Sequence, residues 1–261
     1  MCTVVVLLRP GHAWPVLIAA NRDEMLSRPW RPPAAHWPDR PGVVAGLDEL
    51  AGGSWLGINR EGVVAGILNR HGSLGPAEGR RSRGELVLEA LDHADADLAA
   101  RALAELDTRA YRTFNMVVID NSRAFWLRNL GEDGPGRIEL FPLAPGYSMI
   151  TAHDRNDHES ARIRANLPRF ERAAVPDPER GEWTAWEAIL ASRGQGQEED
   201  GQENAHENAH ENAMCVVTGR GFGTSSSSLI ALPSRERAGV RPRWLFAEGR
   251  PGEAPFLPIV L

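Results

Sequence analysis

The sequence contains no lysine, so all 29 of its basic residues are arginine. We interpret this bias as codon usage rather than as a functional feature. Only two cysteines are present, Cys2 and Cys215, which is too few for a disulfide framework. The formal net charge of −6 argues against nucleic acid or an anionic membrane as a partner, because phosphate binding requires a basic surface.

Long apolar runs are also missing. No stretch approaches the ~18 consecutive apolar residues of a membrane-spanning helix, and the short apolar run at the start lacks the charged segment that begins a secretory signal. We therefore expect a cytoplasmic protein without integral membrane association. Its 261 residues, 42% of them hydrophobic, are enough for a sizeable core, and we expect one domain over residues 1–261. No cofactor is predicted, the expected partner is a small molecule, and the oligomeric state stays open.

The second residue is a candidate nucleophile. We expect Met1 to be removed because Cys2 is small, which leaves Cys2 with a free α-amine beside its thiol. An α-amine titrates near ~7.7–8.0 and a thiol near ~8.5, so the amine can accept the thiol proton close to neutral pH. The alternative is that Cys2 is a small buried hydrophobic residue at the start of a strand.

Polar residues follow the first predicted hairpin. Two apolar runs within residues 3–20 flank a turn and predict an antiparallel pair, and residues 21–24 come where the return strand ends. That end lies beside the start of the first strand, so we expect Arg22 to hold a thiolate and Asp23 to accept hydrogen bonds from the α-ammonium. The alternative is a solvated turn.

Motifs in this part of the chain carry a family resemblance. They are Met1-Cys2, Asn21-Arg22-Asp23-Glu24, Gly52-Gly53-Ser54-Trp55-Leu56-Gly57 and Leu68-Asn69-Arg70. In order and spacing they resemble the NRDE-motif family, the relatives of the transport-and-Golgi-organisation protein, over residues 1–70. That family is in turn similar to the N-terminal-nucleophile hydrolases, such as penicillin V acylase and bile salt hydrolase. The resemblance implies an α+β fold, a four-layer αββα sandwich with Cys2 on a central strand.

The resemblance also implies roles for individual residues. Asn69 would help to form an oxyanion hole, in which one donor can contribute ~3 kcal/mol to the stability of the transition state. The alternative is an asparagine in a turn at a strand end. Four further residues are expected to line the substrate site: Asn21, Glu24, Trp55 and Asn115.

One departure from the family pattern affects the oxyanion hole. Relatives carry a Ser-Asn or Thr-Asn pair where this chain has Thr151 and Ala152. The second donor is therefore missing at this position, unless His153 or Asn156 replaces it.

A second departure affects the charge of the site. Ser225 stands where the family pattern has an arginine, and Ala20 stands where the acylase relatives have one. Because side chains alternate along a strand, Arg22 would face the same way as the arginine lost at position 20. Arg220 is the other residue that would replace the lost charge.

The rest of the chain predicts alternating strands and helices. Residues 25–51, rich in proline and arginine, predict a long surface loop, in which Trp30 and Trp37 either line a substrate entrance or cover a sheet edge. The remaining pattern predicts hairpins at 52–68 and 114–127, strands at 138–141, 147–151, 214–218, 221–232 and 243–246, helices at 82–106 (interrupted at 92–97), 157–172 and 184–193, and a proline-rich tail at 248–261.

Residues 194–213 have low sequence complexity and predict a disordered insertion. They contain His206-Glu207-Asn208-Ala209-His210, which matches the HExxH string of zinc proteases. That motif needs an ordered helix with an apolar back face and a third ligand. We therefore predict no metal site here.

Two functional hypotheses follow. The first is an N-terminal cysteine amidohydrolase that acts on an amide or related acyl bond of a small molecule, with Cys2, Arg22, Asp23 and Asn69 as its catalytic residues. The second is a carrier on the same scaffold that binds haem or an acyl lipid without turnover. The departures at Ala152 and Ser225 favour the carrier, whereas the presence of Cys2 and Asn69 favours the amidohydrolase.

Overall fold

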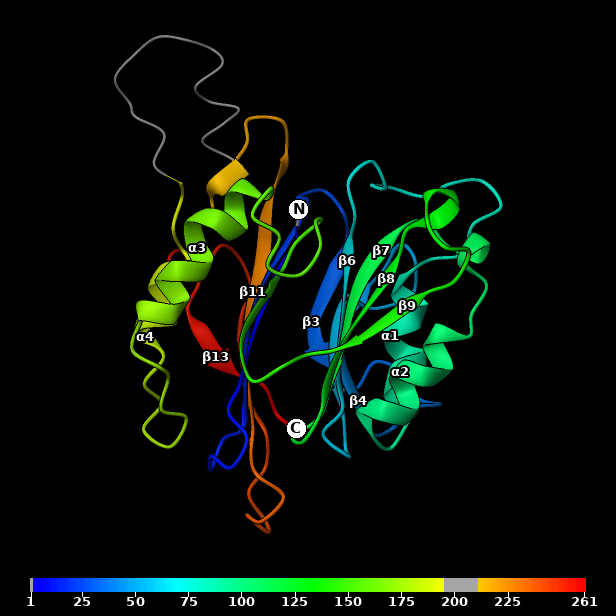
Figure 1. Cartoon of the computed structure of the whole chain (residues 1–261). Coiled ribbons are helices and arrows are strands. Elements are labelled where there is room, and N and C mark those ends of the chain that lie inside the picture. The colour runs from blue at the N-terminus through cyan, green and yellow to red at the C-terminus, as the bar shows by residue number, and fades with distance from the viewer. Residues whose placement is uncertain (1, 195–210) are drawn as a thin grey trace, which may run out of the picture.

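The computed structural model describes residues 2–194 and 211–261, and in these residues two antiparallel β-sheets face each other (Figure 1). The first sheet has the order β10 (Gly146–Ile150), β1 (Thr3–Leu8), β2 (Val16–Met25), β11 (Phe222–Leu232), β12 (Arg243–Ala247) and β13 (Phe256–Pro258). The second has the order β3 (Trp30–Ala34), β4 (Val43–Asp48), β5 (Leu56–Asn59), β6 (Val64–Asn69), β7 (Phe114–Ile119), β8 (Ala124–Asn129) and β9 (Glu139–Pro142).

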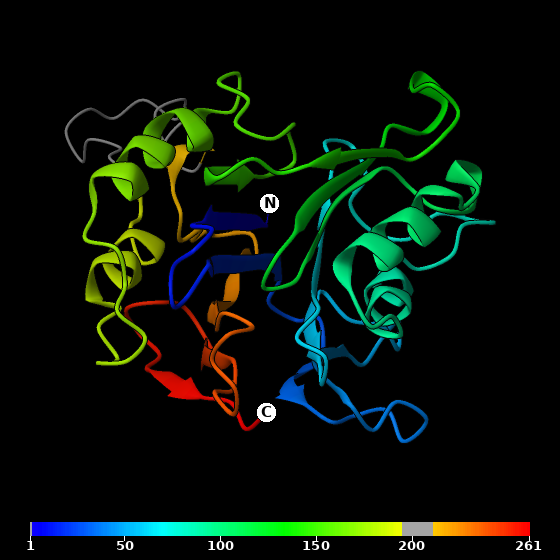
Figure 2. The same cartoon turned by 60° about the horizontal axis from the view of Figure 1, so that its bottom comes forward.

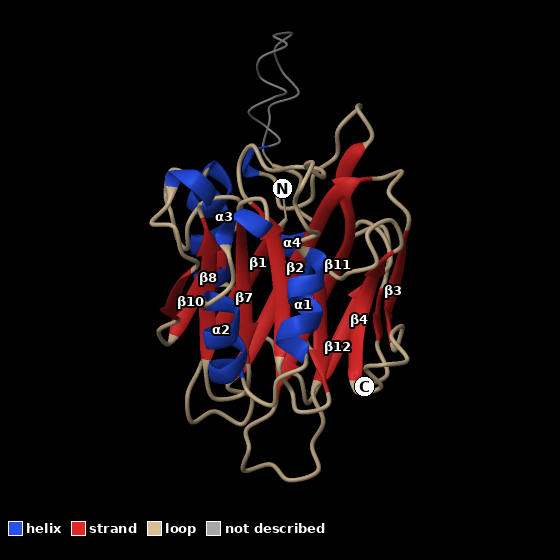
Figure 3. Cartoon of the chain, turned by 90° about the vertical axis from the view of Figure 1, so that its right-hand side faces the viewer, coloured by secondary structure: helices blue, strands red, loops and turns tan. Residues whose placement is uncertain are grey.

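Helices cover the outer face of each sheet. Helices α1 (Gly84–Leu91) and α2 (Ala96–Ala104) lie on the second sheet, and α3 (Ala161–Arg172) and α4 (Thr184–Leu190) lie on the first (Figures 2 and 3). Two short 3-10 helices, η1 (Thr108–Ala110) and η2 (Gly131–Asp133), occur between strands of the second sheet. These four layers confirm the predicted αββα sandwich.

Three apolar cores hold the layers together. In β1, Val4 and Val6 face the core between the sheets, whereas Val5 and Leu7 face the core beneath α3 and α4. Successive side chains of a strand point to opposite faces, so a strand covered on both sides is apolar at every position. This explains why the opening segment forms a continuous apolar run rather than an alternating pattern.

The region predicted as a long loop is the largest correction to the sequence analysis. Residues 25–51 contain β3 and β4. The prolines of β3 are tolerated because β3 is an edge strand, where one side of the backbone needs no partner. Trp30 reaches the core between the sheets, 5.7 Å from the ring of Trp55, whereas Trp37 packs against the core beneath α1 and α2.

Two predictions near the C-terminus were also wrong. Residues 214–218 make only an isolated bridge, between Val217 and Gly223, because this segment turns straight into the start of β11. The predicted tail at 248–261 contains β13, which pairs with β12 and becomes the edge of the first sheet. Of the apolar residues that follow β13, Ile259 and Leu261 pack against the core between the sheets, whereas Val260 is exposed.

Part of the predicted insertion at 194–213 lies outside the described residues, including the whole string His206–His210. Its last residues are described, and the backbone carbonyl of Asn212 accepts a hydrogen bond from Asn166 Nδ2 at 2.7 Å. The single-domain organisation over residues 1–261 stays a prediction. In the described parts of the chain, none of the helices combines the length and the apolar character that a membrane span needs.

A close contact between two glycines fixes the loop that leads to Trp55. Ser54 N donates to Gly84 O at 3.0 Å, and a Cβ added at Gly53 would lie 2.5 Å from the carbonyl carbon of Gly84. The contact joins the start of α1 to the loop before β5. Glycine is required because the backbone of Gly84 occupies the space of a side chain.

We therefore expect Gly53→Ala to lower the free energy of unfolding by about 1–3 kcal/mol, since the overlap involves backbone that cannot rotate away. Chemical denaturation followed by circular dichroism measures the change. Gly219→Ala is the matched control, because its added Cβ meets no atom within 4 Å, and it should change stability by less than about 0.5 kcal/mol. Equal stability of the two variants would show that the contact is not tight.

Candidate functional site

A cleft of about 470 Å³ opens between the two sheets at the end where β1 begins. Cys2, Arg22 and Glu24 line it from the first sheet, and Trp55 and Asn69 line it from the second. The structure thus brings together five of the eight residues that the sequence predicted for the site. The rest of the lining includes residues 75–77, residues 80–84 and Arg112.

The Asn-Arg-Asp-Glu motif lies within β2 rather than after it, which corrects the predicted strand end. Thr3 pairs with Asn21, and β2 continues beside β11 as far as Met25. Because side chains alternate along the strand, Arg22 and Glu24 face the cleft, whereas Asn21 and Asp23 face the layer of α3 and α4. The motif therefore places side chains on both faces of the first sheet.

The thiol of Cys2 is half-buried at the rim of the first sheet. Its Sγ donates to the backbone carbonyl of Asp23 at 3.5 Å. Burial raises the pKa of the Cys2 thiol, and the carboxylate of Asp23 raises it further, while the charge of Arg22 acts in the opposite direction. The thiol is therefore protonated at neutral pH in this arrangement, and it needs a base before it can attack.

Arg22 is buried and lies against an aromatic ring. Its guanidinium carbon is 4.4 Å from the ring centroid of Trp55, and the cation is attracted to the face of the ring. Gly46 leaves the space for this ring, because a Cβ there would lie 2.3 Å from Trp55. Burial lowers the pKa of Arg22, and the negative charge of a Cys2 thiolate would raise it. Arg22 is thus placed to interact with that thiolate.

Ser225 holds the guanidinium of Arg22 in place. Arg22 Nη1 donates to Ser225 Oγ at 2.9 Å, and Ser225 Oγ donates to the Arg22 carbonyl at 3.2 Å. Ser225 occupies an irregular point of β11, where the pairing with β2 shifts. The serine that departs from the family pattern therefore contacts the arginine that we expected to replace the lost charge. Arg220, the other candidate, is exposed and does not line the cleft.

Asp23 forms a buried ion pair that the sequence analysis missed. Arg162 Nη1 on α3 donates to Asp23 Oδ2 at 2.9 Å and to Thr3 Oγ1 at 2.9 Å. Thr224 Oγ1 donates to Asp23 Oδ1 at 2.6 Å. No spacing in the sequence links Arg162 to the N-terminus, because 139 residues separate it from Asp23.

Asn21 joins three segments on the helical side of the first sheet. Its Nδ2 donates to the carbonyls of Leu190 and Met214, at 3.0 and 2.9 Å, and its Oδ1 accepts from Ser227 Oγ. These bonds tie β2 to the end of α4 and to β11. The geometry gives Asn21 a structural position, and its predicted contact with substrate stays a prediction.

The two predicted asparagines of the second sheet differ in their surroundings. Asn69 at the end of β6 lines the cleft, and no hydrogen bond of its side-chain amide is recorded among the described residues. Asn115 is fully buried: its Oδ1 accepts from Arg70 and Trp126, and its Nδ2 donates to the carbonyls of Thr151 and His153. Asn69 is therefore available to a ligand, whereas Asn115 links the two sheets.

Neither replacement for the missing second oxyanion donor lines this cleft. Asn156 turns back onto β10, where its Oδ1 accepts from Met149 N at 2.7 Å. His153 lies in a neighbouring cavity of about 460 Å³, with its Nε2 2.7 Å from Nε2 of His71. Ala152 is buried and carries no donor. Asn69 is thus the predicted oxyanion donor that the cleft retains.

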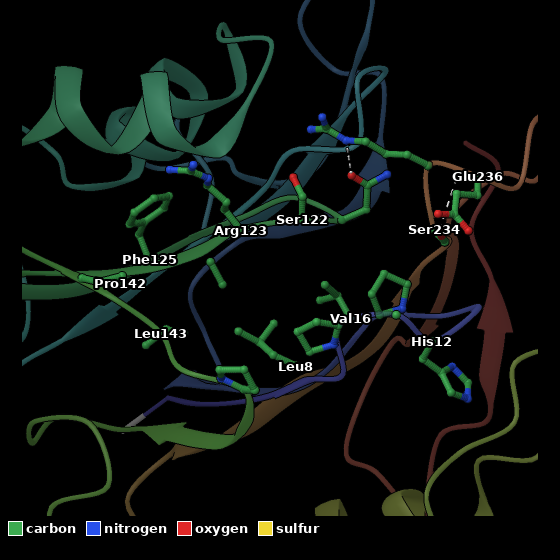
Figure 4. Close-up of a pocket in the computed structure, with 17 residues that line it drawn as sticks. Leu8, His12, Val16, Ser122, Arg123, Phe125, Pro142, Leu143, Ser234 and Glu236 are labelled. Carbon is green, nitrogen blue, oxygen red and sulfur yellow. Dashed lines mark hydrogen bonds between the residues drawn. The ribbon is translucent and has the colours of Figure 1, made fainter.

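A further cavity of about 570 Å³ lies at the opposite end of β1 and β2 (Figure 4). Leu8, Val16, Phe125 and Leu143 supply much of its apolar lining. It contains neither cysteine, and it is separated from Cys2 by the length of β1. The chemistry predicted from the sequence therefore belongs to the smaller cleft.

Comparison with known proteins relates the chain to a family by sequence. Residues 1–241 match the family described as Transport and Golgi organisation 2. The chain is 35% identical over 167 residues to the Transport and Golgi organization protein 2 homolog of Bos taurus, covering 58% of this chain and 57% of the relative. It is 33% identical over 162 residues to the Homo sapiens homolog, covering 57% of this chain and 56% of that protein. The match thus spans little more than half the length of these relatives.

Solved structures are similar in fold. The Caenorhabditis elegans N-acylethanolamine-hydrolyzing acid amidase ortholog has a TM-score of 0.53 at 12% identity, covering 87% of this chain and 92% of that one. A mutant of the conjugated bile acid hydrolase of Clostridium perfringens has a TM-score of 0.52 at 12% identity, covering 99% and 92%. These similarities confirm the N-terminal-nucleophile hydrolase-like fold.

The family match extends over nearly all of the chain, and it includes the residues that line the cleft. The narrower NRDE-motif grouping stays a prediction. The protein belongs to the Transport and Golgi organisation 2 family.

Proposed function

We propose that this protein is an N-terminal cysteine amidohydrolase that cleaves an amide or related acyl bond of a small molecule in the cytoplasm. The observation that carries the proposal is the pairing of two groups across the cleft. Cys2 lines it from the first sheet, and Asn69 lines it from the second. Acyl transfer requires a thiol and an N–H donor beside the same carbonyl group, and these two residues could supply them.

In the proposed reaction, removal of Met1 frees the α-amine of Cys2, which accepts the thiol proton. The sulfur then attacks the substrate carbonyl carbon, and Asn69 Nδ2 donates a hydrogen bond to the oxygen that gains the negative charge. When the C–N bond breaks, the leaving amine takes the proton from the α-ammonium, and a thioester remains on Cys2. Water, deprotonated by the α-amine, hydrolyses the thioester and releases the acid.

The other residues support this chemistry by position. Arg22 offers positive charge to the thiolate, and Trp55 and Ser225 hold its guanidinium. Asp23 lies behind the N-terminal strand, where it supplies negative charge for the α-ammonium and is itself paired with Arg162.

Two observations favour the non-catalytic carrier instead. Burial and Asp23 raise the pKa of Cys2, and the second oxyanion donor is missing at Ala152. A carrier would bind its haem or acyl lipid in the cleft and release it unchanged. The formation of a covalent acyl group on Cys2 separates the two functions.

We expect p-nitrophenyl octanoate to transfer one octanoyl group to Cys2 only when the α-amine of Cys2 is free. Intact-mass spectrometry measures the added acyl group in protein with a removable N-terminal extension, before and after its cleavage. Cys215→Ser is the matched control and should keep the label, because Cys215 is buried away from the cleft. Labelling that persists in Cys2→Ala, or before the extension is cleaved, would rule out the mechanism.

Asn69→Ala should lower kcat for an octanoyl anilide by about 10²–10³-fold, because one oxyanion donor is lost. The rate at which iodoacetamide alkylates Cys2 should not change, since alkylation forms no oxyanion. An unchanged kcat would remove Asn69 from the mechanism, and a parallel fall in both rates would point to a general distortion of the cleft.

With the N-terminal extension in place, alkylation of Cys2 should be slow at neutral pH and should rise into the alkaline range, because only the thiolate reacts and the pKa of Cys2 is raised. Arg22→Met should move this pH profile further upward, since Arg22 lowers the pKa of the thiol. The measurement uses Cys215→Ser protein, so that Cys2 carries the only thiol that can be alkylated. A profile that moves to lower pH in Arg22→Met would contradict the assigned role of the arginine.

A further inference from the structure

The cleft around Cys2 carries an excess of positive charge, although the whole chain is acidic. Among the described residues, its lining includes two carboxylates, Glu24 and Asp48, and six arginines: Arg22, Arg28, Arg80, Arg81, Arg83 and Arg112. Overall composition therefore does not describe the local field that a substrate would meet.

Two of these arginines are neutralised by carboxylates. Arg28 Nη2 lies 2.7 Å from Asp48 Oδ2, and Arg81 Nε lies 2.6 Å from Glu85 Oε1. Each pair satisfies a positive charge within the protein. The arginines that matter for a ligand are those without such a partner.

Arg83 and Arg112 are held by uncharged oxygens. Arg83 Nη1 donates to Ser73 Oγ and to the carbonyl of Thr113, both at 2.9 Å. Arg112 donates to the carbonyls of Gly72 and Leu74, both at 2.6 Å, and more weakly to those of Gly75 and Pro76. In the described ranges no carboxylate lies within ion-pair distance of either guanidinium.

The two charges also oppose each other. Burial lowers the pKa of Arg83 to about 10, and the neighbouring charge of Arg112 contributes to the shift, whereas Cys2 and Glu24 act in the opposite direction. Arg83 remains protonated at neutral pH, but its charge is incompletely compensated. The negative charge of an anion bound beside it would offset both the cost of burying the guanidinium and the repulsion from Arg112.

We propose that Arg83 and Arg112 form an anion-binding subsite that selects acyl-amide substrates carrying a carboxylate or phosphate group. This inference rests on the proposed function, because it names the class of substrate for the same cleft. Both side chains are fixed by hydrogen bonds to residues 72–76 and 113, so they are ordered before the ligand arrives. A guanidinium fork matches the oxygens of either anion, and the cleft volume fits a small acyl amide.

Matched pairs of ligands test the subsite without turnover, in Cys2→Ala protein. One pair is N-octanoylglycine and its neutral amide, N-octanoylglycinamide; the other is N-octanoyl-O-phosphoethanolamine and N-octanoylethanolamine. Calorimetric titration at fixed ionic strength should show that the anion of at least one pair binds about tenfold more tightly than its neutral partner. Comparison of the two pairs distinguishes a carboxylate from a phosphate ligand.

Substitutions then locate the preference. Arg83→Gln and Arg112→Gln should each reduce it to about threefold or less, and Arg83→Lys should retain part of it. Arg180→Gln is the matched control, because Arg180 is exposed and pairs with Asp177 outside the cleft. Thermal denaturation shows whether each variant is folded. The comparison of anionic with neutral ligands in protein that keeps both arginines does not depend on the folding of these variants.

Equal affinity within both pairs would overturn the subsite, as would a preference that survives in both glutamine variants. Anion binding in Cys2→Ala protein, combined with no cleavage of any of the four amides by the protein with Cys2, would support the subsite and overturn the proposed hydrolase. Cleavage of neutral and anionic amides with equal kcat/KM would support the proposed hydrolase and overturn the subsite.

Discussion

The antiparallel pairing of β1 with β2 is the constraint on which the site depends. Thr3 pairs with Asn21, and this register places the start of the chain beside the Asn-Arg-Asp-Glu motif within β2. Because side chains alternate, the same two strands place Cys2 and Arg22 in the cleft while Thr3 and Asp23 face α3. A shift by one residue would exchange these two sets of side chains.

The polar groups on the helical side of the first sheet are fixed by hydrogen bonds. Asp23 receives hydrogen bonds from Arg162 and Thr224, and Asn21 joins β2 to the end of α4. Buried charges are costly unless they are paired and hydrogen-bonded, and this network meets that requirement for Asp23. The helical layer thus does more than cover the sheet, because α3 supplies the counterion for a residue next to the N-terminus.

On the cleft side, three arginines are held by uncharged groups instead of by a carboxylate. Arg22 is held by a serine hydroxyl and an aromatic face, and Arg83 and Arg112 are held by hydroxyl and carbonyl oxygens. These neutral partners fix the guanidinium groups without cancelling their charge. The raised pKa of Cys2 shows that burial outweighs the nearby positive charge while no base is present. A free α-amine on the same residue would supply that base directly. Removal of Met1 would therefore make the thiol of Cys2 reactive.

The apolar patterns of the sequence by themselves predicted most of the strands and helices, because segments with an apolar face must be buried by packing against one another. The four layers in which they stack were implied by the family resemblance. The predicted first hairpin also brought Cys2 and Arg22 close together, and the family resemblance pointed to Asn69. The sequence was misleading for residues 25–51, where proline concealed an edge strand, and for the motif, which continues β2. Only the tertiary structure decided which motif residues face the cleft, that Arg162 pairs with Asp23, and that Arg83 and Arg112 line the same cleft as Cys2. These contacts join residues far apart in the chain, and no local pattern encodes them because the packing of the two sheets and their helices creates them.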